Sequence, residues 1–171
     1  MKRKQGVIIS GFGGVGKTML AKKYKNVIDL ESSPYKYVYN HIEHVDYEKM
    51  KGKEGRIRNK NYPENYIKAI KEAVNNYDIV CVRSNADEDV DFYDTYGLQY
   101  IVCYPTKKAY KKYISRFKNR GNSKEWIEKN KKYYEIAYKR YKNFKGERIL
   151  LHDDQTLEDA LLKRNYTLVP R

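Results

Sequence analysis

Eight residues near the start of the chain have the types and spacing that bind a polyphosphate. They read Gly11-Phe12-Gly13-Gly14-Val15-Gly16-Lys17-Thr18 and fit G-x-x-x-x-G-K-[ST], the pattern of a P-loop. Such a loop wraps phosphates with backbone N–H groups, so several positions need angles or close approach that glycine allows. The residues expected to bind the triphosphate are Gly11, Gly13, Gly14, Val15, Gly16, Lys17 and Thr18.

Two side chains of this motif have predicted chemical roles. Lys17 is expected to reach the β- and γ-phosphates, and the Thr18 hydroxyl to ligate Mg²⁺. The helix that begins near Lys17 would add unpaired N–H groups and the positive end of its dipole. The motif predicts binding of a nucleoside triphosphate but does not name the reaction, because many chemistries share this loop.

The elements that must position the motif follow the pattern of an α/β fold. Val7–Ser10 predicts a buried strand before the loop, and residues 19–24 predict a helix after it. None of the predicted strands alternates cleanly, as expected for a parallel sheet covered on both faces, and we predict a three-layer α/β/α fold. The four further strands are expected at Asn26–Leu30, Asp78–Val82, Leu98–Tyr104 and Arg148–Leu151.

Helical patterns lie between these strands. One helix is expected to begin at Pro63, and a shorter one to end at Gly97. Another spans Thr106 to about Lys118. Asn122 and Glu125 have the spacing of a capping box that would begin a long helix. The residues Leu157, Leu161 and Leu162 predict a final helix.

Length and composition limit the class of protein. The length of 171 residues predicts one domain. No apolar run is as long as a membrane span, and the apolar run after Lys2–Lys4 is too short for a signal peptide. Cys81 and Cys103 lie in strand-like runs and are expected to be buried, reduced thiols. We therefore expect a cytoplasmic protein with no membrane partner.

The net charge of +14 is concentrated in one block. Residues 106–148 hold 16 Lys and Arg but 4 Asp and Glu, a net charge of +12. Such a block indicates a phosphate-rich partner, either a bound nucleotide or a nucleic acid. The alternative is compositional drift in an A+T-rich genome, since the chain holds 19 Tyr and abundant Lys; the lysines would then be solvated helix surface.

The motif, the five strands and the basic block before the last strand resemble the small P-loop kinases. These include nucleoside and nucleoside-monophosphate kinases, with their shikimate- and gluconate-kinase-like relatives, and the chain also resembles small kinases carried by phages. The resemblance implies a P-loop NTPase fold in which an acid at the end of the second strand faces the acceptor hydroxyl. Asp29 would orient that hydroxyl or act as a general base, and Glu31 is the second candidate; alternatively, Asp29 caps the turn after its strand.

Two further segments carry the resemblance. Arg83-Ser84 matches the end of a Glu-Arg-Ser motif in deoxynucleoside kinases, although Val82 replaces the acid and no Walker B acid ends this strand. Arg83 and Ser84 would contact the acceptor; Arg83 could equally be a structural ion-pair partner. Arg116 and Arg120 resemble a lid, at about residues 116–122, that closes on the triphosphate; the alternative is a solvated helix face.

The polar segment at about residues 43–62 is read either as an acceptor-side flap or as a plain surface loop. Together these features predict an ATP- and Mg²⁺-dependent kinase that acts on a nucleoside or nucleotide. One alternative is a kinase for a polynucleotide or a modified DNA base, for which the basic block would bind nucleic acid. A second alternative is a nucleotide-binding regulator without phosphotransfer.

Overall fold

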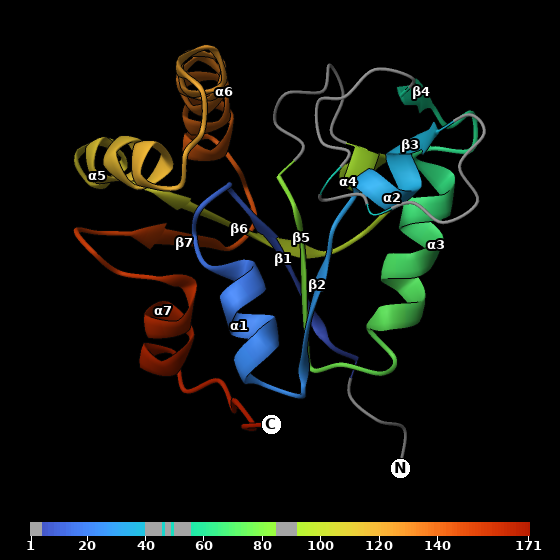
Figure 1. The fold of residues 1–171 in the computed structure, drawn as a ribbon. Coiled ribbons are helices and arrows are strands. Elements are labelled where there is room, and N and C mark those ends of the chain that lie inside the picture. Colours follow the sequence, from blue (N-terminus) through green and yellow to red (C-terminus); the bar gives the residue numbers. More distant parts are fainter. Residues whose placement is uncertain (1–4, 40–45, 47–48, 50–55, 85–91) are drawn as a thin grey trace.

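A five-stranded parallel sheet forms the centre of the molecule (Figure 1). The computed structural model describes residues 5–39, 46, 49, 56–84 and 92–171. The strand order is β2-β5-β1-β6-β7, and every pairing between neighbours is parallel. The strands are β1 (Val7–Gly11), β2 (Val27–Leu30), β5 (Ile79–Arg83), β6 (Tyr100–Pro105) and β7 (Arg148–Leu151). The predicted parallel α/β sheet is thus confirmed, whereas the narrower expectation of a P-loop NTPase fold stays a prediction.

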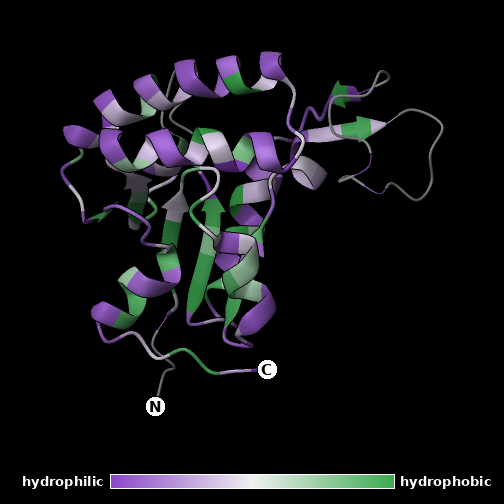
Figure 2. Ribbon diagram, turned by 60° about the vertical axis from the view of Figure 1, so that its left-hand side comes forward, coloured by the Kyte–Doolittle hydropathy of each residue, from purple (hydrophilic) through white to green (hydrophobic). Residues whose placement is uncertain are grey.

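Burial explains why these runs are apolar throughout. Nearly all residues of β1, β5 and β6 are buried, because helices cover both faces of the central strands. The strand β7 is at the edge of the sheet, and its exposure alternates: Arg148 and Leu150 are exposed, while Ile149 and Leu151 are buried. Figure 2 shows the same contrast, with apolar strands inside and hydrophilic outer faces on the helices.

The helices divide between the two faces of the sheet. The connection from β1 to β2 crosses the sheet in one direction and the later connections cross it in the other, so right-handed crossovers put their helices on opposite faces. Helix α1 (Lys17–Lys23) contacts α7 (Leu157–Lys163) on one face, and α3 (Glu64–Ala73) with α4 (Phe92–Thr95) covers the other (Figure 1). Two further helices, α5 (Lys107–Asn119) and α6 (Lys124–Lys142), pack together near the carboxyl end of β6.

The start of α6 differs from the predicted capping box. Ser123, not Asn122, is the cap, and its side chain accepts a hydrogen bond from the Trp126 N–H. The reason is the end of α5: Gly121 has φ 82°, and the Asn122 N–H donates to the Phe117 carbonyl. This is the Schellman arrangement that closes a helix, so Asn122 belongs to the end of α5 and the cap moves one residue on.

A small hairpin beside the sheet was not predicted. After α2 (Ser33–Lys36), strand β3 (Tyr37–Tyr39) pairs antiparallel with β4 (Arg56–Arg58). Of the predicted 43–62 loop, residues 43–45, 47–48 and 50–55 lie outside the described residues. The described part from residue 56 onward is β4 and the approach to α3, so both interpretations of the loop stay predictions.

Tyrosines form much of the core between the sheet and the helices. Several hydroxyls donate to carbonyls at the carboxyl ends of strands, as Tyr66 does to Leu30, Tyr93 to Arg83 and Tyr134 to Pro105. Each buried ring therefore fills core volume while its polar end remains hydrogen-bonded. Among the described residues, no helix is long and apolar enough to cross a membrane.

Candidate functional site

The glycine loop (Phe12–Gly16) joins β1 to α1 and is held by its own backbone. The Phe12 N–H donates to the Cys103 carbonyl on β6 at 2.9 Å, and the Val15 carbonyl accepts from the Leu157 N–H of α7 at 2.9 Å. Gly14 and Gly16 have φ values of 88° and 103°, which a side chain would strain.

Three amides of this loop have no acceptor. Within the described residues, the N–H groups of Gly13, Gly14 and Gly16 make no hydrogen bond. Gly13 is exposed, Gly14 and Gly16 are partly exposed, and successive unpaired N–H groups of this kind can bind an anion. This arrangement fits the predicted role of the glycines in holding phosphate.

Phe12, which the motif leaves unspecified, anchors the loop to α5 and α6. Its fully buried ring stacks on Tyr133 at 5.3 Å between centroids and meets Tyr110 and Tyr134 edge-on. Only the tertiary structure reveals this role, since an aromatic residue at this position has no signature of its own. The packing connects the loop to α5, which carries Arg116 and ends at Arg120.

Lys17 lies across the loop. Its Nζ donates to the Gly11 carbonyl at 2.8 Å and to the Phe12 carbonyl at 3.3 Å. A Cβ on Gly11 would come within 2.9 Å of the Lys17 Cδ, so glycine leaves room for the lysine stem. The ammonium is therefore held beside the loop before any phosphate arrives.

Thr18 and Asp29 face each other beside Lys17. The Thr18 Oγ1 donates to the Asp29 Oδ2 at 2.7 Å, from the first turn of α1 to strand β2. The Asp29 Oδ1 is buried and has no hydrogen-bond partner among the described residues. Because the partner of Asp29 is Thr18, its contacts do not match the alternative in which it caps the turn after β2.

These two side chains fit a magnesium ion. Mg²⁺ keeps several waters and binds through one or two protein oxygens together with substrate phosphates, so it needs no dedicated cage. In the described part of the chain, no group of three or more His, Cys, Asp or Glu could hold a metal. Thr18 Oγ1 is the candidate direct ligand, and the unpaired Asp29 Oδ1 could receive a water of the ion.

The two cysteines lie beneath this site as buried thiols. Burial raises the pKa of Cys103 to about 12, and the positive charge of Lys17 acts in the opposite direction. Burial also raises the pKa of Cys81, and the negative charge of Asp29 raises it further. Both thiols are therefore protonated at neutral pH, as the sequence predicted for buried, reduced cysteines.

Arg116 lies near the loop because it contacts two residues, Tyr113 and Asp154, that belong to the loop's surroundings. Its guanidinium lies 4.8 Å from the ring centre of Tyr113, which packs against Gly14, and its Nη2 is 3.7 Å from Asp154 Oδ1. Lys112 also binds Asp154, at 2.9 Å, and this hydrogen bond lowers the pKa of the carboxyl. Asp154 belongs to the turn before α7. Thr156, which caps α7, lies next to Gly16 of the loop.

Arg120 is one turn farther along the chain and is exposed. Its side chain makes no hydrogen bond or ion pair with any residue that the structure describes. The contacts thus bring Arg116, but not Arg120, to the surroundings of the loop. The lid role of Arg120 stays a prediction.

The predicted acceptor residues lie at the ends of β2 and β5. Glu31 is exposed immediately after β2. Arg83 is partly buried and donates from Nη1 to the Tyr62 hydroxyl at 3.3 Å. Ser84 is buried, and its hydroxyl is hydrogen-bonded to the Tyr141 hydroxyl. Of the three, Glu31 and Arg83 have accessible side chains, whereas Ser84 is engaged by α6.

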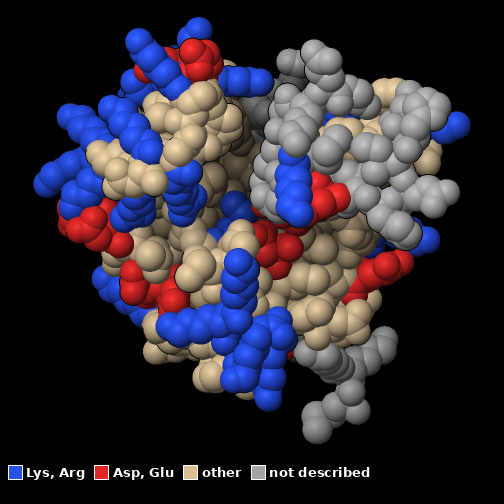
Figure 3. Space-filling model, viewed as in Figure 1, with Lys and Arg blue, Asp and Glu red and all other residues tan. Residues whose placement is uncertain are grey.

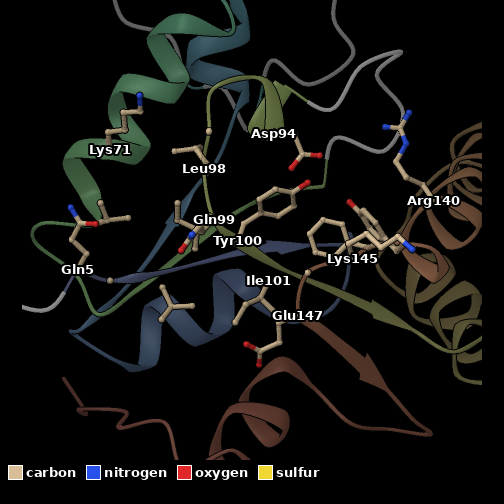
Figure 4. A pocket seen from close by; sticks show the side chains of 18 of the residues that line it. Gln5, Lys71, Asp94, Leu98, Gln99, Tyr100, Ile101, Arg140, Lys145 and Glu147 are labelled. Carbon is tan, nitrogen blue, oxygen red and sulfur yellow. The ribbon is translucent and has the colours of Figure 1, made fainter.

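A hollow lies at the opposite end of the sheet, beside the amino ends of its strands (Figure 4). Its volume is about 1520 Å³, and the residues around it include Lys71, Asp94, Arg140 and Glu147. It borders the amino ends of β1 and β6, whereas ligands of open parallel sheets bind beyond the carboxyl ends. This hollow is therefore separate from the site around the glycine loop.

Comparison with known proteins assigns no family. No protein-family model matches the chain, and no curated protein matches it. The function must therefore be inferred from the geometry of the site.

Proposed function

We propose that the protein is an ATP-dependent kinase of the P-loop type that transfers the γ-phosphoryl group to a nucleoside or nucleotide. The observation that carries the proposal is the 2.7 Å hydrogen bond between Thr18 and Asp29. It brings a carboxylate from the second strand next to the loop with unpaired amides. An acid at this place could orient an acceptor hydroxyl, a role that phosphoryl transfer requires.

The donor half of the site would bind ATP through the backbone and Lys17. The unpaired amides of Gly13, Gly14 and Gly16 would donate to phosphate oxygens, and Lys17 would exchange its two carbonyl partners for the β- and γ-phosphates. Mg²⁺, bound by Thr18, would neutralise charge on those phosphates. Preorganised positive charge of this kind is the main catalytic contribution in phosphoryl transfer.

The acceptor half would depend on Asp29. If Thr18 turns to the metal, the Asp29 carboxylate becomes available to accept a hydrogen bond from the acceptor hydroxyl and hold it in line. Glu31 and Arg83 would contact other groups of the acceptor. Arg116 would approach the transferring phosphoryl group from α5, since its planar guanidinium suits phosphate oxygens.

Incubation with γ-labelled ATP and a panel of nucleosides, nucleoside monophosphates and oligonucleotides tests the proposal. We expect label on a nucleoside or nucleotide and, in the Lys17→Ala variant, a fall in turnover on the order of 10³-fold or more, the scale of removing a phosphate-stabilising cation. The matched control is Lys22→Ala, which removes an exposed lysine from the same helix.

Three results would contradict the proposal. Tight ATP binding with no labelled product on any acceptor would favour a nucleotide-binding regulator. Label found only on oligonucleotides would make the acceptor a polynucleotide. Equal turnover in the Lys17→Ala and Lys22→Ala variants would remove the loop from the donor site.

A further inference from the structure

Helix α5 carries no acidic residue. Its buried face consists of Ala109, Tyr110, Tyr113 and Phe117. Between residues 107 and 120 the other positions include seven cations, namely Lys107, Lys108, Lys111, Lys112, Arg116, Lys118 and Arg120. Lys108, Lys112, Arg116 and Arg120 are four residues apart, so they form one ridge along the helix, with about 6 Å of rise between neighbours.

Most cations of α5, α6 and the turn after α6 make no ion pair within the described part of the chain. The ion pairs here are Lys107–Glu135, Lys131–Glu128, and the pairs of Lys112 and Arg116 with Asp154. Ten other cations are exposed and make no ion pair with the residues that the structure describes. They are Lys108, Lys111, Lys118, Arg120, Lys124, Lys129, Lys132, Lys139, Lys142 and Lys145. Figure 3 shows Lys and Arg gathered over α5 and α6.

The only tryptophan of the chain lies where these two helices meet. Trp126 is 41% exposed, although one edge-on contact with Phe117, at 5.0 Å between ring centres, fixes its orientation. Arg120 and Lys124 precede it in the sequence, and Lys129 follows it one helical turn later. An exposed aromatic ring held among cations is the combination with which proteins stack the bases of single-stranded nucleic acid.

Other polyanions fit this surface less well. A membrane-binding helix needs a continuous apolar face, but the apolar faces of α5 and α6 are buried, and Trp126 and Ile136 are exposed singly. An interface with an acidic protein would need an apolar centre, which these helices also lack. Duplex DNA would use the cations but leave no unstacked base for Trp126.

We propose that the outer surface of α5 and α6 binds single-stranded nucleic acid. Phosphates contact exposed lysines that make no ion pair with the described residues, chiefly Lys108, Lys111, Lys118 and Lys124, and a base stacks on Trp126. The binding requires no phosphotransfer, so it is independent of the kinase function proposed above. It gives the basic block a partner other than the bound nucleotide.

The first experiment titrates the full-length protein with an oligothymidine, without ATP, and follows Trp126 fluorescence. We expect quenching, and an affinity that falls steeply with salt. The test variant replaces Lys108, Lys111, Lys118 and Lys124 with Gln; the control replaces four exposed lysines elsewhere, Lys22, Lys25, Lys68 and Lys163. For every phosphate that a replaced lysine no longer binds, the salt slope should fall by about 0.7. An equal loss of affinity in both variants would overturn the proposal.

The second experiment measures the stacking itself. With a fluorescein-labelled oligothymidine, the anisotropy of the complex should show that Trp126→Ala weakens binding by about tenfold and Trp126→Phe by less, as expected for one stacked base. Unchanged affinity in Trp126→Ala would remove the base contact. Tighter binding to a duplex of the same length, or binding to phosphatidylserine vesicles but not to the oligonucleotide, would overturn the assignment to single strands.

Discussion

The two halves of the candidate site differ in how firmly the fold holds them. On the donor side, the glycine loop is tied to β6 through the Phe12 N–H, to α7 through the Val15 carbonyl, and to α5 and α6 through the Phe12 ring. On the proposed acceptor side, Glu31 is exposed after β2, and farther along the chain β3 and β4 form a two-stranded hairpin in which Arg56, Ile57 and Arg58 are all exposed. One half is packed into the core, and the other presents side chains to solvent.

The proposed function gives this difference a chemical reason. A triphosphate has the same geometry in every reaction, so a rigid loop with fixed amides serves it well. Acceptors differ, and selection among them depends on side chains at the rim of the site. Substitutions at the two places should therefore have different effects. Where the loop is anchored, they should lower the stability of the fold, and where charged side chains contact the substrate, they should lower turnover.

The largest effect is expected where the donor loop enters the core. Phe12→Ala should lower the free energy of unfolding by about 3–5 kcal/mol, because it removes a fully buried aromatic ring. Denaturant unfolding measures this change. The control is Met19→Ala, which truncates a side chain on α1 that is 68% exposed. This variant should change the free energy of unfolding by less than about 0.5 kcal/mol. Similar values for both variants would contradict an anchored loop.

Arg116 tests whether α5 takes part in the chemistry. We expect Arg116→Ala to lower kcat on the order of 10²-fold, while ATP affinity changes less, because the guanidinium acts on charge that develops during transfer. Arg120→Ala should have a smaller effect, because Arg120 is farther from the loop. Steady-state kinetics with a fixed acceptor measure both. If kcat in the Arg116 variant is unchanged, α5 has no lid function.

Asp29 tests the boundary between the two halves. Asp29→Asn keeps the shape and a hydrogen bond to Thr18 but loses the negative charge, and we expect kcat to fall by about tenfold to 10²-fold with ATP binding retained. Isothermal titration with a non-hydrolysable ATP analogue, together with kinetics, separates the two quantities. A loss of nucleotide binding with normal kcat would assign Asp29 to the donor side instead.

The smallest effect concerns Asp154, at the outer edge of the donor side. Lys112 lowers the pKa of this carboxyl, so Lys112→Ala should move its titration to higher pH. Because the folded-state pKa lies below that of the unfolded chain, the pair stabilises the fold above the unfolded pKa. That contribution disappears as the pH falls through the folded pKa. Carboxyl chemical shifts in an NMR titration measure the midpoint, and an unmoved midpoint would mean that the ion pair does not persist in solution.

The fold could be predicted from the sequence where its pattern is local. Apolar runs predicted five strands within about two residues, and the glycine motif placed the loop between β1 and α1. The hairpin of β3 and β4 was missed because Tyr37–Tyr39 and Arg56–Arg58 are only three residues long, too short to show a period, and pair across a long segment. The cap of α6 was misplaced by one residue because Asn122 serves the preceding helix end.

Parts of the candidate site could likewise be predicted from the sequence, and other parts depend on the tertiary structure. Residue types and spacing alone identified the loop, Lys17 and Thr18, and the resemblance to small kinases added the acid on the second strand. The contact between Thr18 and Asp29 depends on strand order, since β5 lies between β1 and β2. The contacts of Arg116 and the engagement of Ser84 by Tyr141 depend on how α5 and α6 pack on the sheet.

By itself, the sequence determined the parallel α/β sheet, the glycine loop and the excess of positive charge, because each follows from neighbouring residues and their spacing. Only the tertiary structure decided that Phe12 anchors the loop and that Arg116 and Arg120 have different surroundings. It also decided that Trp126 is exposed among the lysines. These features join residues far apart in the chain, and no local pattern specifies which side chains will meet when the helices pack on the sheet.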